Sequence, residues 1–433
     1  SVQRPRPTVG LARTTSPECP RLAQGEVGRL GQARRHGRVL NTTRPDGKVI
    51  SQSYDLNGNL ASLTPPGKPA HTFAYTDVDL RSQYSPPDAG FTPLATTYDY
   101  NGDRQLDLVT RPDGKTIDYV YDDYGRLEDV VTGAGTRTRS YDAKTGKLAS
   151  IEAPAITLDF GYDGHLLTDV DWSDTVSTIG SYEASYDDNF WLVQEKVNGA
   201  DPIDFGYDDD GLLTSAEDMT VTRDDAGPPA RDLGGRVTAT VLDEVSDTYG
   251  YNDFGELESY AAVHDDGTVT HLLSVDFERD ALGRITEKTE TIGGTTTVYA
   301  YTYDLAGRLA TVTEDSTLVS TYAYDDNGNR LSHATSGGTT YGTYDEQDRQ
   351  LSYGDEVFTY TSHGELLTRE DTVSGDWAAF TYDVFGNLTH VGLSSGDDIQ
   401  YLVDGQDRRV IKTLNGSVVK QWLYRSQLQV VAE

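Results

Sequence analysis

The 433-residue sequence lacks several features that usually hold a compact domain or a membrane protein together. Its single cysteine, Cys19, excludes a disulfide within the chain, and cysteine usage does not indicate the compartment. No apolar run approaches membrane-spanning length, so no membrane span is expected, and the first residues show no secretory signal pattern. Because the chain opens at Ser1 rather than Met, we interpret it as a fragment of a longer protein.

Apolar residues are also scarce. Hydrophobic residues make up only 36% of the chain, which is low for a compact core between two layers. The 28 Tyr and 43 Gly residues favour instead a sheet with wide solvated surfaces.

Basic residues are rare beyond the beginning of the chain. Residues 1–50 hold ten Lys or Arg and three Asp or Glu, a net charge of +7, whereas the remainder holds 26 basic and 67 acidic residues, a net charge of −41. Nucleic acid is therefore not expected as a partner, because phosphate binding needs positive charge. Three explanations of the excess of acidic residues stay open: Asp residues required by turn geometry, a salt-rich habitat, or an acidic wall suited to a basic partner or guest.

What the sequence has in abundance is a repeat. Tyr is followed directly by Asp eleven times, most often with Gly three residues after the Asp. The pairs that begin at Tyr98, Tyr121, Tyr141, Tyr162, Tyr186 and Tyr207 are 20 to 24 residues apart. A period of this length is typical of an architecture in which one supersecondary unit is stacked many times.

Each repeat predicts a β-hairpin. Asp at the first position and Gly at the fourth favour a type I turn that ends in a left-handed residue. A second turn signal, Arg-Pro-Asp-Gly-Lys, occurs at residues 44–48 and 111–115. Two such turns in about 21 residues leave room for two strands of ordinary length.

The side chains alternate as strands require. Aromatic residues such as Tyr119 and Tyr121 stand two apart, which predicts ladders of rings on one face, with the hydroxyls reaching polar groups at the edge. After the turn, Leu127 and Val130 stand three apart, which would put them on opposite faces of a regular strand. We therefore expect a bulge after each turn.

These signals predict an all-β fold in which antiparallel β-hairpin repeats coil into a spiral sheet or an open, partial hollow shell. Residues 1–40 contain eight Arg and no Lys and are predicted to form a basic, disordered extension or linker, with a partner-binding arm as the alternative. Residues 41–433 are predicted to hold about seventeen hairpins.

A formal match to a hydrolase motif occurs at residues 392–396, Gly-Leu-Ser-Ser-Gly. The nucleophile elbow needs a helix after the serine, whereas residues 399–403 have the pattern of a strand. Ser394 is therefore predicted to lie in a loop between hairpins, and the protein is not expected to be an enzyme.

Oxygen ligands at calcium-loop spacing occur at Asp99, Asn101, Asp103 and Asp107. Because the same residues belong to a Tyr-Asp repeat, we interpret them as turn residues, and residues 325–329 and 208–210 likewise. The histidines are dispersed without paired metal-ligand spacing, so no metal or cofactor is expected; they are His36, His71, His165, His264, His271, His333, His363 and His390.

The repeat resembles the Tyr-Asp (YD) repeat of the Rhs family, which is shared with the insecticidal toxin complexes of bacteria and the teneurins of animals. The resemblance rests on the pattern Tyr-x-Tyr-Asp-x-x-Gly-Arg-Leu at residues 119–127 and 301–309, and on the two Arg-Pro-Asp-Gly-Lys turns. It covers residues 41–433, and residues 404–424 look like the stretch that precedes the family's core-associated region.

In that family such hairpins wind into a hollow shell around a C-terminal toxic domain, which is released by a self-cleaving aspartic site. The core-associated and toxin domains look absent here, so no residue inherits a catalytic role. The resemblance implies a non-catalytic shell segment of a polymorphic toxin or cell-surface protein of bacteria, secreted or displayed at the surface, that encapsulates or presents a C-terminal effector domain.

The partners implied by the resemblance are the effector and core-associated domains, together with secretion or delivery proteins. The alternative is a carbohydrate-binding or adhesion module in which the Tyr ladders contact glycans on another cell.

Overall fold

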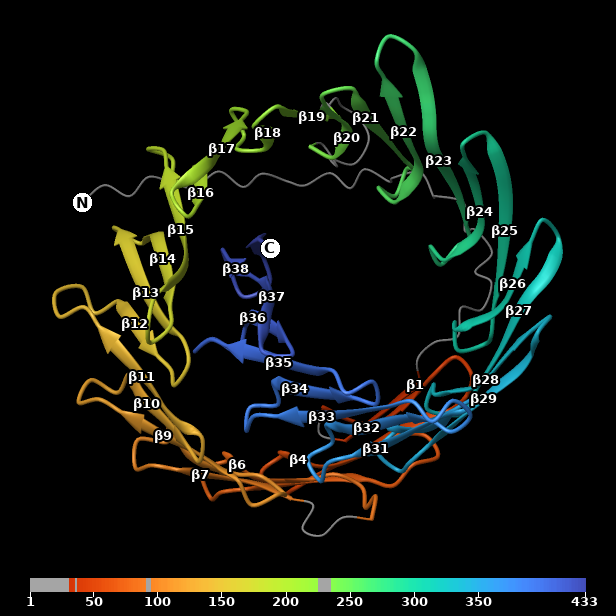
Figure 1. Ribbon diagram of the computed structural model, residues 1–433. Coiled ribbons are helices and arrows are strands. Elements are labelled where there is room, and N and C mark those ends of the chain that lie inside the picture. The colour runs from red at the N-terminus through yellow and green to blue at the C-terminus, as the bar shows by residue number, and fades with distance from the viewer. Residues whose placement is uncertain (1–30, 36, 91–94, 225–234) are drawn as a thin grey trace, which may run out of the picture.

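The structure is a computed structural model that describes residues 31–35, 37–90, 95–224 and 235–433, and strands account for its regular structure (Figure 1). The first strands are β1 (Gly31–Arg35), β2 (Arg38–Thr43), β3 (Val49–Tyr54), β4 (Leu60–Thr64), β5 (His71–Tyr75), β6 (Arg81–Ser85), β7 (Thr96–Tyr100), β8 (Leu106–Thr110), β9 (Thr116–Tyr121), β10 (Leu127–Thr132), β11 (Gly135–Tyr141), β12 (Leu148–Glu152), β13 (Thr157–Asp163), β14 (Leu166–Ser173), β15 (Thr178–Tyr186) and β16 (Leu192–Val197).

The middle strands are β17 (Ala200–Tyr207), β18 (Leu213–Ala216), β19 (Met219–Arg223), β20 (Val237–Leu242), β21 (Val245–Tyr251), β22 (Leu257–Asp265), β23 (Val269–Arg279), β24 (Ile285–Ile292), β25 (Thr295–Tyr303), β26 (Leu309–Glu314), β27 (Thr317–Tyr324) and β28 (Arg330–Thr335). The last strands are β29 (Gly338–Tyr344), β30 (Gln350–Tyr353), β31 (Glu356–Tyr360), β32 (Leu366–Asp371), β33 (Trp377–Tyr382), β34 (Leu388–Leu393), β35 (Asp398–Val403), β36 (Arg409–Leu414), β37 (Ser417–Gln421), β38 (Leu423–Tyr424) and β39 (Val430–Ala432).

The strands pair in the order of the chain. From β1 to β37 each strand lies antiparallel to the next, which makes one 37-stranded sheet, and β38 and β39 form a separate pair. No helix occurs in the described ranges, so the predicted all-β array of antiparallel hairpins is confirmed.

The sheet begins earlier than predicted. Strand β1 pairs with β2, which spans residue 41, so the boundary expected between residues 40 and 41 lies inside the sheet. Neither strand carries the Tyr-Asp signal, and for that reason the sequence pattern missed this hairpin. The prediction of disorder for residues 1–30 lies outside the described residues.

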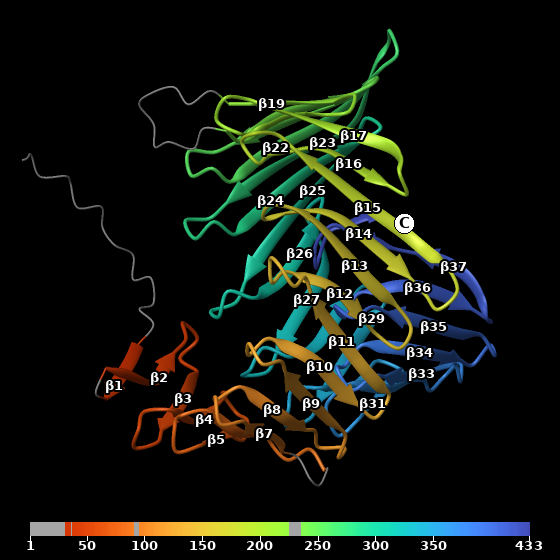
Figure 2. The same ribbon diagram turned by 90° about the vertical axis from the view of Figure 1, so that its left-hand side faces the viewer.

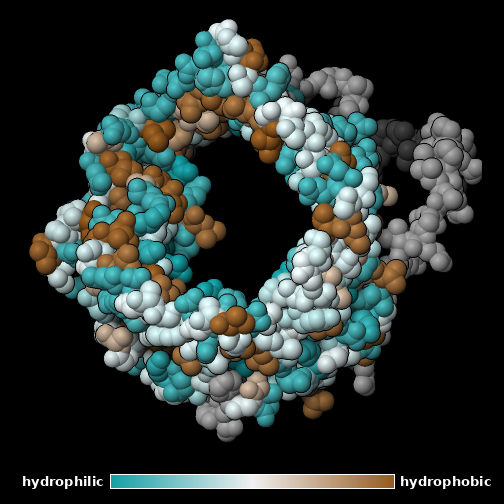
Figure 3. All heavy atoms as spheres, turned by 45° about the vertical axis from the view of Figure 1, so that its right-hand side comes forward, coloured by the Kyte–Doolittle hydropathy of each residue, from teal (hydrophilic) through white to brown (hydrophobic). Residues whose placement is uncertain are grey.

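The sheet winds into an open spiral. Figure 1 shows it curving through a complete ring, after which β29 to β37 pass the beginning of the sheet as a second round. Seen from the side, the second round lies next to the first along the axis (Figure 2). Because β1 pairs only with β2, and β37 only with β36, hydrogen bonds do not close the ring. The space-filling view shows a wall around an open lumen (Figure 3).

The Tyr-Asp turn has the same geometry in most repeats. In the turn between β9 and β10, Oδ1 of Asp122 accepts hydrogen bonds from the backbone N–H groups of Tyr124 (2.9 Å) and Arg126 (2.8 Å). Gly125 closes the turn with φ of 76°, a left-handed conformation that glycine adopts without steric strain. These turns form one edge of the spiral, the Tyr-Asp rim, and the other turns, such as 44–48 and 111–115, form the opposite rim.

Tyr and Arg of the motif join each repeat to its neighbour. The Tyr141 hydroxyl donates to the backbone carbonyl of Leu127 in the preceding repeat (2.7 Å). Arg126 binds Asp122 of its own turn (2.6 Å) while its guanidinium lies 4.2 Å from the centre of the Tyr141 ring. Equivalent hydroxyl bonds come from Tyr54, Tyr75, Tyr100, Tyr121, Tyr186, Tyr207, Tyr251, Tyr303, Tyr324, Tyr344, Tyr360 and Tyr424. The predicted ladders are therefore present, with their hydroxyls bound to the neighbouring backbone.

A second version of the motif uses Asn in place of this Arg. Asn59 donates from Nδ2 to Oδ1 of Asp79 in the next turn (2.7 Å), where Asp79 occupies the left-handed position with φ of 62°. The same pairing joins Asn329 to Asp348 (2.6 Å) and Asn387 to Asp407 (2.7 Å). Wherever Asn replaces Arg in these three turns, an Asp has replaced Gly in the following one.

The predicted bulge is confirmed. Tyr121 lies opposite Leu127, but Val120 lies opposite Asp129, so Glu128 is the extra residue. The same shift follows the Tyr-Asp turns of the other repeats, for example between Thr302 and Tyr303.

The turn of the repeat that contains Tyr98 lies two residues later than predicted. The turn between β7 and β8 is built on Tyr100 and Asn101, because the N–H of Asn101 bonds the carbonyl of Gln105 (2.9 Å). Tyr98 and Asp99 lie within β7 instead. Asn therefore replaces Asp as the turn residue, and the next repeat unit starts at Tyr121 with the regular spacing.

Two clusters of buried apolar side chains lie where the two rounds meet. One cluster joins Trp172, Tyr182 and neighbouring residues of β12–β15 to Val410, Ile411 and Leu423 of the second round. Another joins Val109, Ile117 and Val130 to Val384. Elsewhere the wall is a single half-buried sheet, as the low apolar content predicts.

Candidate functional site

The second round of the spiral contacts the first along one line, which we call the seam. The seam joins the Tyr-Asp rim of residues 325–429 to the opposite rim of residues 44–197. Successive turns of the second round meet successive turns of the first. The ion pairs across it are Lys48–Asp326 (2.8 Å), Lys68–Asp348 (3.6 Å), Arg111–Glu365 (2.6 Å), Arg137–Asp407 (2.8 Å) and Arg425–Glu195 (3.0 Å).

Arg111 is the most enclosed cation of the seam, with 4% of its surface exposed. Its Nη1 donates to the backbone carbonyl of Val384 (2.6 Å) and its Nη2 to Oε1 of Glu365 (2.6 Å). Burial disfavours the charge of Glu365, but the Thr361 hydroxyl and the Arg111 guanidinium together hold the pKa of Glu365 below its usual value. Burial, and next the charge of Arg111, lower the pKa of the neighbouring His363.

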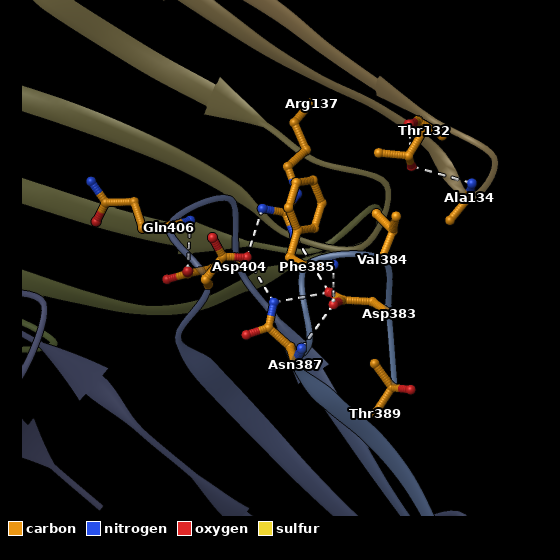
Figure 4. A network of polar contacts seen from close by, with 12 residues as sticks. Thr132, Ala134, Arg137, Asp383, Val384, Phe385, Asn387, Thr389, Asp404 and Gln406 are labelled. Carbon is orange, nitrogen blue, oxygen red and sulfur yellow. Dashed lines mark hydrogen bonds and ion pairs between the residues drawn. The ribbon is translucent and has the colours of Figure 1, made fainter. Parts of the chain in front are cut away.

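Arg137 holds the other side of the same turn. Its Nη1 donates to Oδ1 of Asp407, which also accepts a hydrogen bond from Asn387 (2.7 Å), and its guanidinium lies 3.8 Å from the centre of the Phe385 ring. Figure 4 shows Phe385 lying along the Arg137 side chain, with Asp383 and Asn387 in the turn below. Arg111 and Arg137 thus clamp residues 383–387 from two sides.

The end of the chain packs inside the ring against β12–β16, as Figure 1 shows. Trp172 is fully buried, and its Nε1 donates to Oδ2 of Asp404 (3.3 Å). Arg408 pairs with the same carboxylate (2.8 Å) and lies over the Trp172 ring. A polar turn is buried here, and its Asp404 carboxylate is bound by residues of both rounds.

This packing identifies the inner face of the wall. Val170, Trp172 and Tyr182 contact the inner strands, so residues two apart from them on each strand also face inwards. The acidic residues between them face outwards. Asp159 lies opposite Asp171, and Asp169 opposite Glu183, on the outer face. Burial and then these neighbouring carboxylates raise the pKa of Asp171. In this part of the wall the acid therefore faces away from the lumen.

Two cavities of about 420 and 400 Å³ flank the clamped turn, and Val384 and Phe385 line both. Arg137, His390 and Tyr401 line the first, and Arg111 and His363 the second. The seam thus leaves open space on both sides of this turn.

The family model of the teneurin YD-shell matches residues 34–431. The chain belongs to this family. Teneurin-3 of Danio rerio is 24% identical over 441 residues, which cover 93% of this chain and 16% of that protein. Teneurin-4 of Homo sapiens is 25% identical over 427 residues, which cover 90% of this chain and 15% of that protein. The chain thus spans only a small part of its curated relatives.

Solved structures share the fold of this YD shell. A crystal structure of TcdB2-TccC3-TEV matches with a TM-score of 0.64 and 12% identity, over 90% of this chain and 27% of that chain. The Tc holotoxin pore of Photorhabdus luminescens matches with a TM-score of 0.65 and 13% identity, over 89% of this chain and 24% of that chain.

Ser394 and Asp99 take no part in the seam contacts, whereas residues 325–329, His363 and His390 lie at the seam. Ser394 lies in the turn between β34 and β35, where its Oγ donates to Oδ1 of Asp376 (3.0 Å), so the predicted loop between hairpins is present. Asp99 lies in β7 opposite Leu108, not in the turn with Asn101 and Asp103.

Several of the other candidates have structural partners, and His36 lies outside the described residues. Oδ1 of Asp325 and of Asp208 each accepts backbone hydrogen bonds within its own turn. His333 stacks on Tyr322, and His71 on Tyr84. Within the described ranges, no group of three His, Cys, Asp or Glu side chains is placed to hold a metal ion, and no helix could span a membrane.

The seam residues themselves were not identified from the sequence. Arg111 and Arg44 were recognised only as parts of turns, although both Arg-Pro-Asp-Gly-Lys turns contact the second round. The available signal was the position of the basic residues, because the cations of the opposite rim are concentrated in the rows that the second round covers.

Proposed function

We propose that this chain is a non-catalytic wall segment of a hollow YD shell, and that the shell encloses or presents a C-terminal effector domain absent from this chain. The observation that carries the proposal is the path of the chain: after one complete ring, β36 to β39 turn inside the wall of β12–β16 and are held there by Trp172 and Glu195. A domain joined after Glu433 would start on the lumen side.

The solved relatives support this proposal. One of them is the crystal structure of TcdB2-TccC3 without its hypervariable C-terminal region, which matches with a TM-score of 0.63 over 92% of this chain. We also infer an extracellular setting, secreted or at a cell surface, where shells of either the toxin or the teneurin kind act.

The carbohydrate-binding alternative receives less support from the Tyr ladders. Hydroxyls such as that of Tyr303 bond the preceding repeat, and the Tyr303 ring is contacted by Arg284 at 4.5 Å. A glycan array tests this alternative, and a selective hit would favour it. Likewise, loss of an enzymatic activity on Ser394→Ala substitution would contradict the non-catalytic assignment.

Enclosure is tested with a peptide tag and protease site fused after Glu433, compared with the same cassette fused before Ser1. We expect the C-terminal site to be cut about tenfold more slowly, because the wall around the lumen restricts the access of a protease to this site. Arg111→Met should accelerate C-terminal cleavage alone. Equal cleavage at both ends would contradict the container function.

A further inference from the structure

The opposite rim continues beyond the seam without a cover. From β16 to β27 it consists of the turns at residues 198–199, 217–218, 243–244, 266–268, 293–294 and 315–316, which we call the free rim. No described segment packs on it, whereas the same rim at residues 111–115 is covered by the second round. The hairpin of β22 and β23 stands out from the ring here in both views (Figures 1 and 2).

Apolar side chains at the free rim are exposed where their counterparts in the seam are buried. Val109 and Ile117, which flank the covered turn, are 8% and 7% exposed. Leu242 and Val245, the directly opposed pair at the turn at residues 243–244, are 49% and 40% exposed. Further exposed apolar residues at the free rim are Val241, Val269, Leu272, Ile292 and Leu318. A row of this kind along one edge is typical of an interaction surface.

The charge of the rim also changes sign. Its covered part presents Arg44, Lys48, Lys68 and Arg111 to the turns of the second round. The free-rim turns contain no Lys or Arg. Their acidic residues, with those directly beside them, are Glu217, Asp218, Asp243, Glu244, Asp265, Asp266, Glu314 and Asp315, and none of these forms an ion pair within the described chain.

The negative charge of the free rim indicates which kind of partner can bind there. A second copy would have to dock through its Tyr-Asp rim, as the second round does, but that rim is acidic, and like charges would face each other. We propose that the free rim is a docking surface for a partner polypeptide that presents apolar side chains flanked by Lys or Arg. The apolar row supplies burial and the acidic turns supply selectivity for a basic partner. This inference is independent of encapsulation, because it depends only on the exposed apolar and acidic residues of the free rim and not on what the lumen contains.

The test uses the full chain and three disulfide-closed hairpin peptides with Lys-Val, Glu-Val and Lys-Ser faces, measured by fluorescence anisotropy. We expect the Lys-Val peptide to bind about tenfold more tightly than either counterpart, and its affinity to fall as salt is raised. The double substitution Asp243→Asn with Glu244→Gln should weaken binding about tenfold, and Val241→Ser with Val245→Ser by a similar factor.

The matched control is Asp253→Asn with Phe254→Ser, which removes one charge and one exposed apolar side chain at the other end of the same hairpins. This variant should bind as the parent does. Absence of Lys-Val binding, or equal binding by the Asp243/Glu244 variant, would overturn the proposal. Self-association in sedimentation that the Val241/Val245 variant abolishes would assign the rim to a second copy and would overturn it as well.

Discussion

Arg111 and Glu365 form an ion pair of 2.6 Å although 254 positions of the sequence separate them. The pair is almost fully enclosed, with side-chain exposures of 3% and 11%. It joins a turn of the first round to a turn of the second, so it forms only when the spiral has completed a full ring.

Replacing Arg111 by Met should open the seam. The Glu365 carboxylate would lose its cation and the Val384 carbonyl its donor in a buried place, which destabilises a fold by roughly 3–5 kcal/mol. Urea unfolding measures the loss, and small-angle scattering should show an expanded particle. The matched control is Lys115→Met in the same turn, where the side chain is 59% exposed and the expected change is within about 0.5 kcal/mol. Equal effects of the two substitutions would argue against a role of Arg111 in closing the ring.

Replacing Gly307 or Gly125 by Val should damage single repeats. Their φ angles are 84° and 76°, and the added side chain would strain a left-handed backbone by on the order of 1–2 kcal/mol. Hydrogen exchange should rise in the adjacent hairpins only, since each repeat leans on its neighbours. Gly102→Ala is the control, because Gly102 is not in the left-handed region and nothing crowds it. Cooperative loss of protection along the whole chain would instead indicate a single core.

The local unit could be predicted from the sequence because everything that defines it lies within one period. The N–H groups of Gly125 and Arg126 donate to Asp122 within a segment of five residues. The bulge at Glu128 follows from the spacing of Leu127 and Val130. Alternation of side chains then gives the strands, the face of the Tyr ladder and the all-β class.

The seam could not be predicted because its register depends on the curvature summed over many repeats. Nothing near residue 111 indicates that it meets residue 365 rather than another acidic turn. The turn predicted from the Tyr98-Asp99 pair was wrong for a local reason. Asn101 supplies the same side-chain acceptor as Asp, so the turn forms two residues later.

Asn59 and Asp79 should be energetically coupled. Their hydrogen bond of 2.7 Å joins two consecutive turns, so a double-mutant cycle with Asn59→Ala and Asp79→Ala should give a coupling of about 0.5–1 kcal/mol. The control cycle pairs Asn59→Ala with Asp77→Ala, a substitution in the turn that contains Asp79. The changes in unfolding free energy of these two substitutions should add within about 0.5 kcal/mol. Additivity in both cycles would show that the Asn-Asp version of the motif is not a coupled unit.

The seam should weaken in mild acid. Burial and Arg111 lower the pKa of His363, so the folded seam favours neutral His363, and its stability falls as pH drops below about 6.5, the usual histidine value. The pKa of Glu365 is lowered too, so its contribution is present above the usual carboxyl range and is lost as pH falls through the lower folded value. Hydrogen exchange at residues 111–115 and 361–365 between pH 7.5 and 5 measures the effect. His363→Gln should remove the first phase, and a seam equally protected at both pH values would contradict the prediction.

Trp172 should hold the end of the chain inside the wall. Its side chain is fully buried between Val410, Ile411 and Leu423, and its Nε1 bonds Asp404, so Trp172→Ala leaves a large cavity and removes one donor from a carboxylate that Arg408 still binds. The expected loss is roughly 3–5 kcal/mol, confined to the packing of β36 to β39 on β12–β16. Limited proteolysis should then cut within residues 404–432, while β20 to β28 stay protected. Trp377→Ala is the control, since Trp377 is 46% exposed on the opposite rim and its removal should leave the proteolysis pattern unchanged. If the Trp172 variant were cut no faster than the Trp377 variant, the inner position of the last strands would depend on the backbone path of β35 to β37 rather than on this side chain.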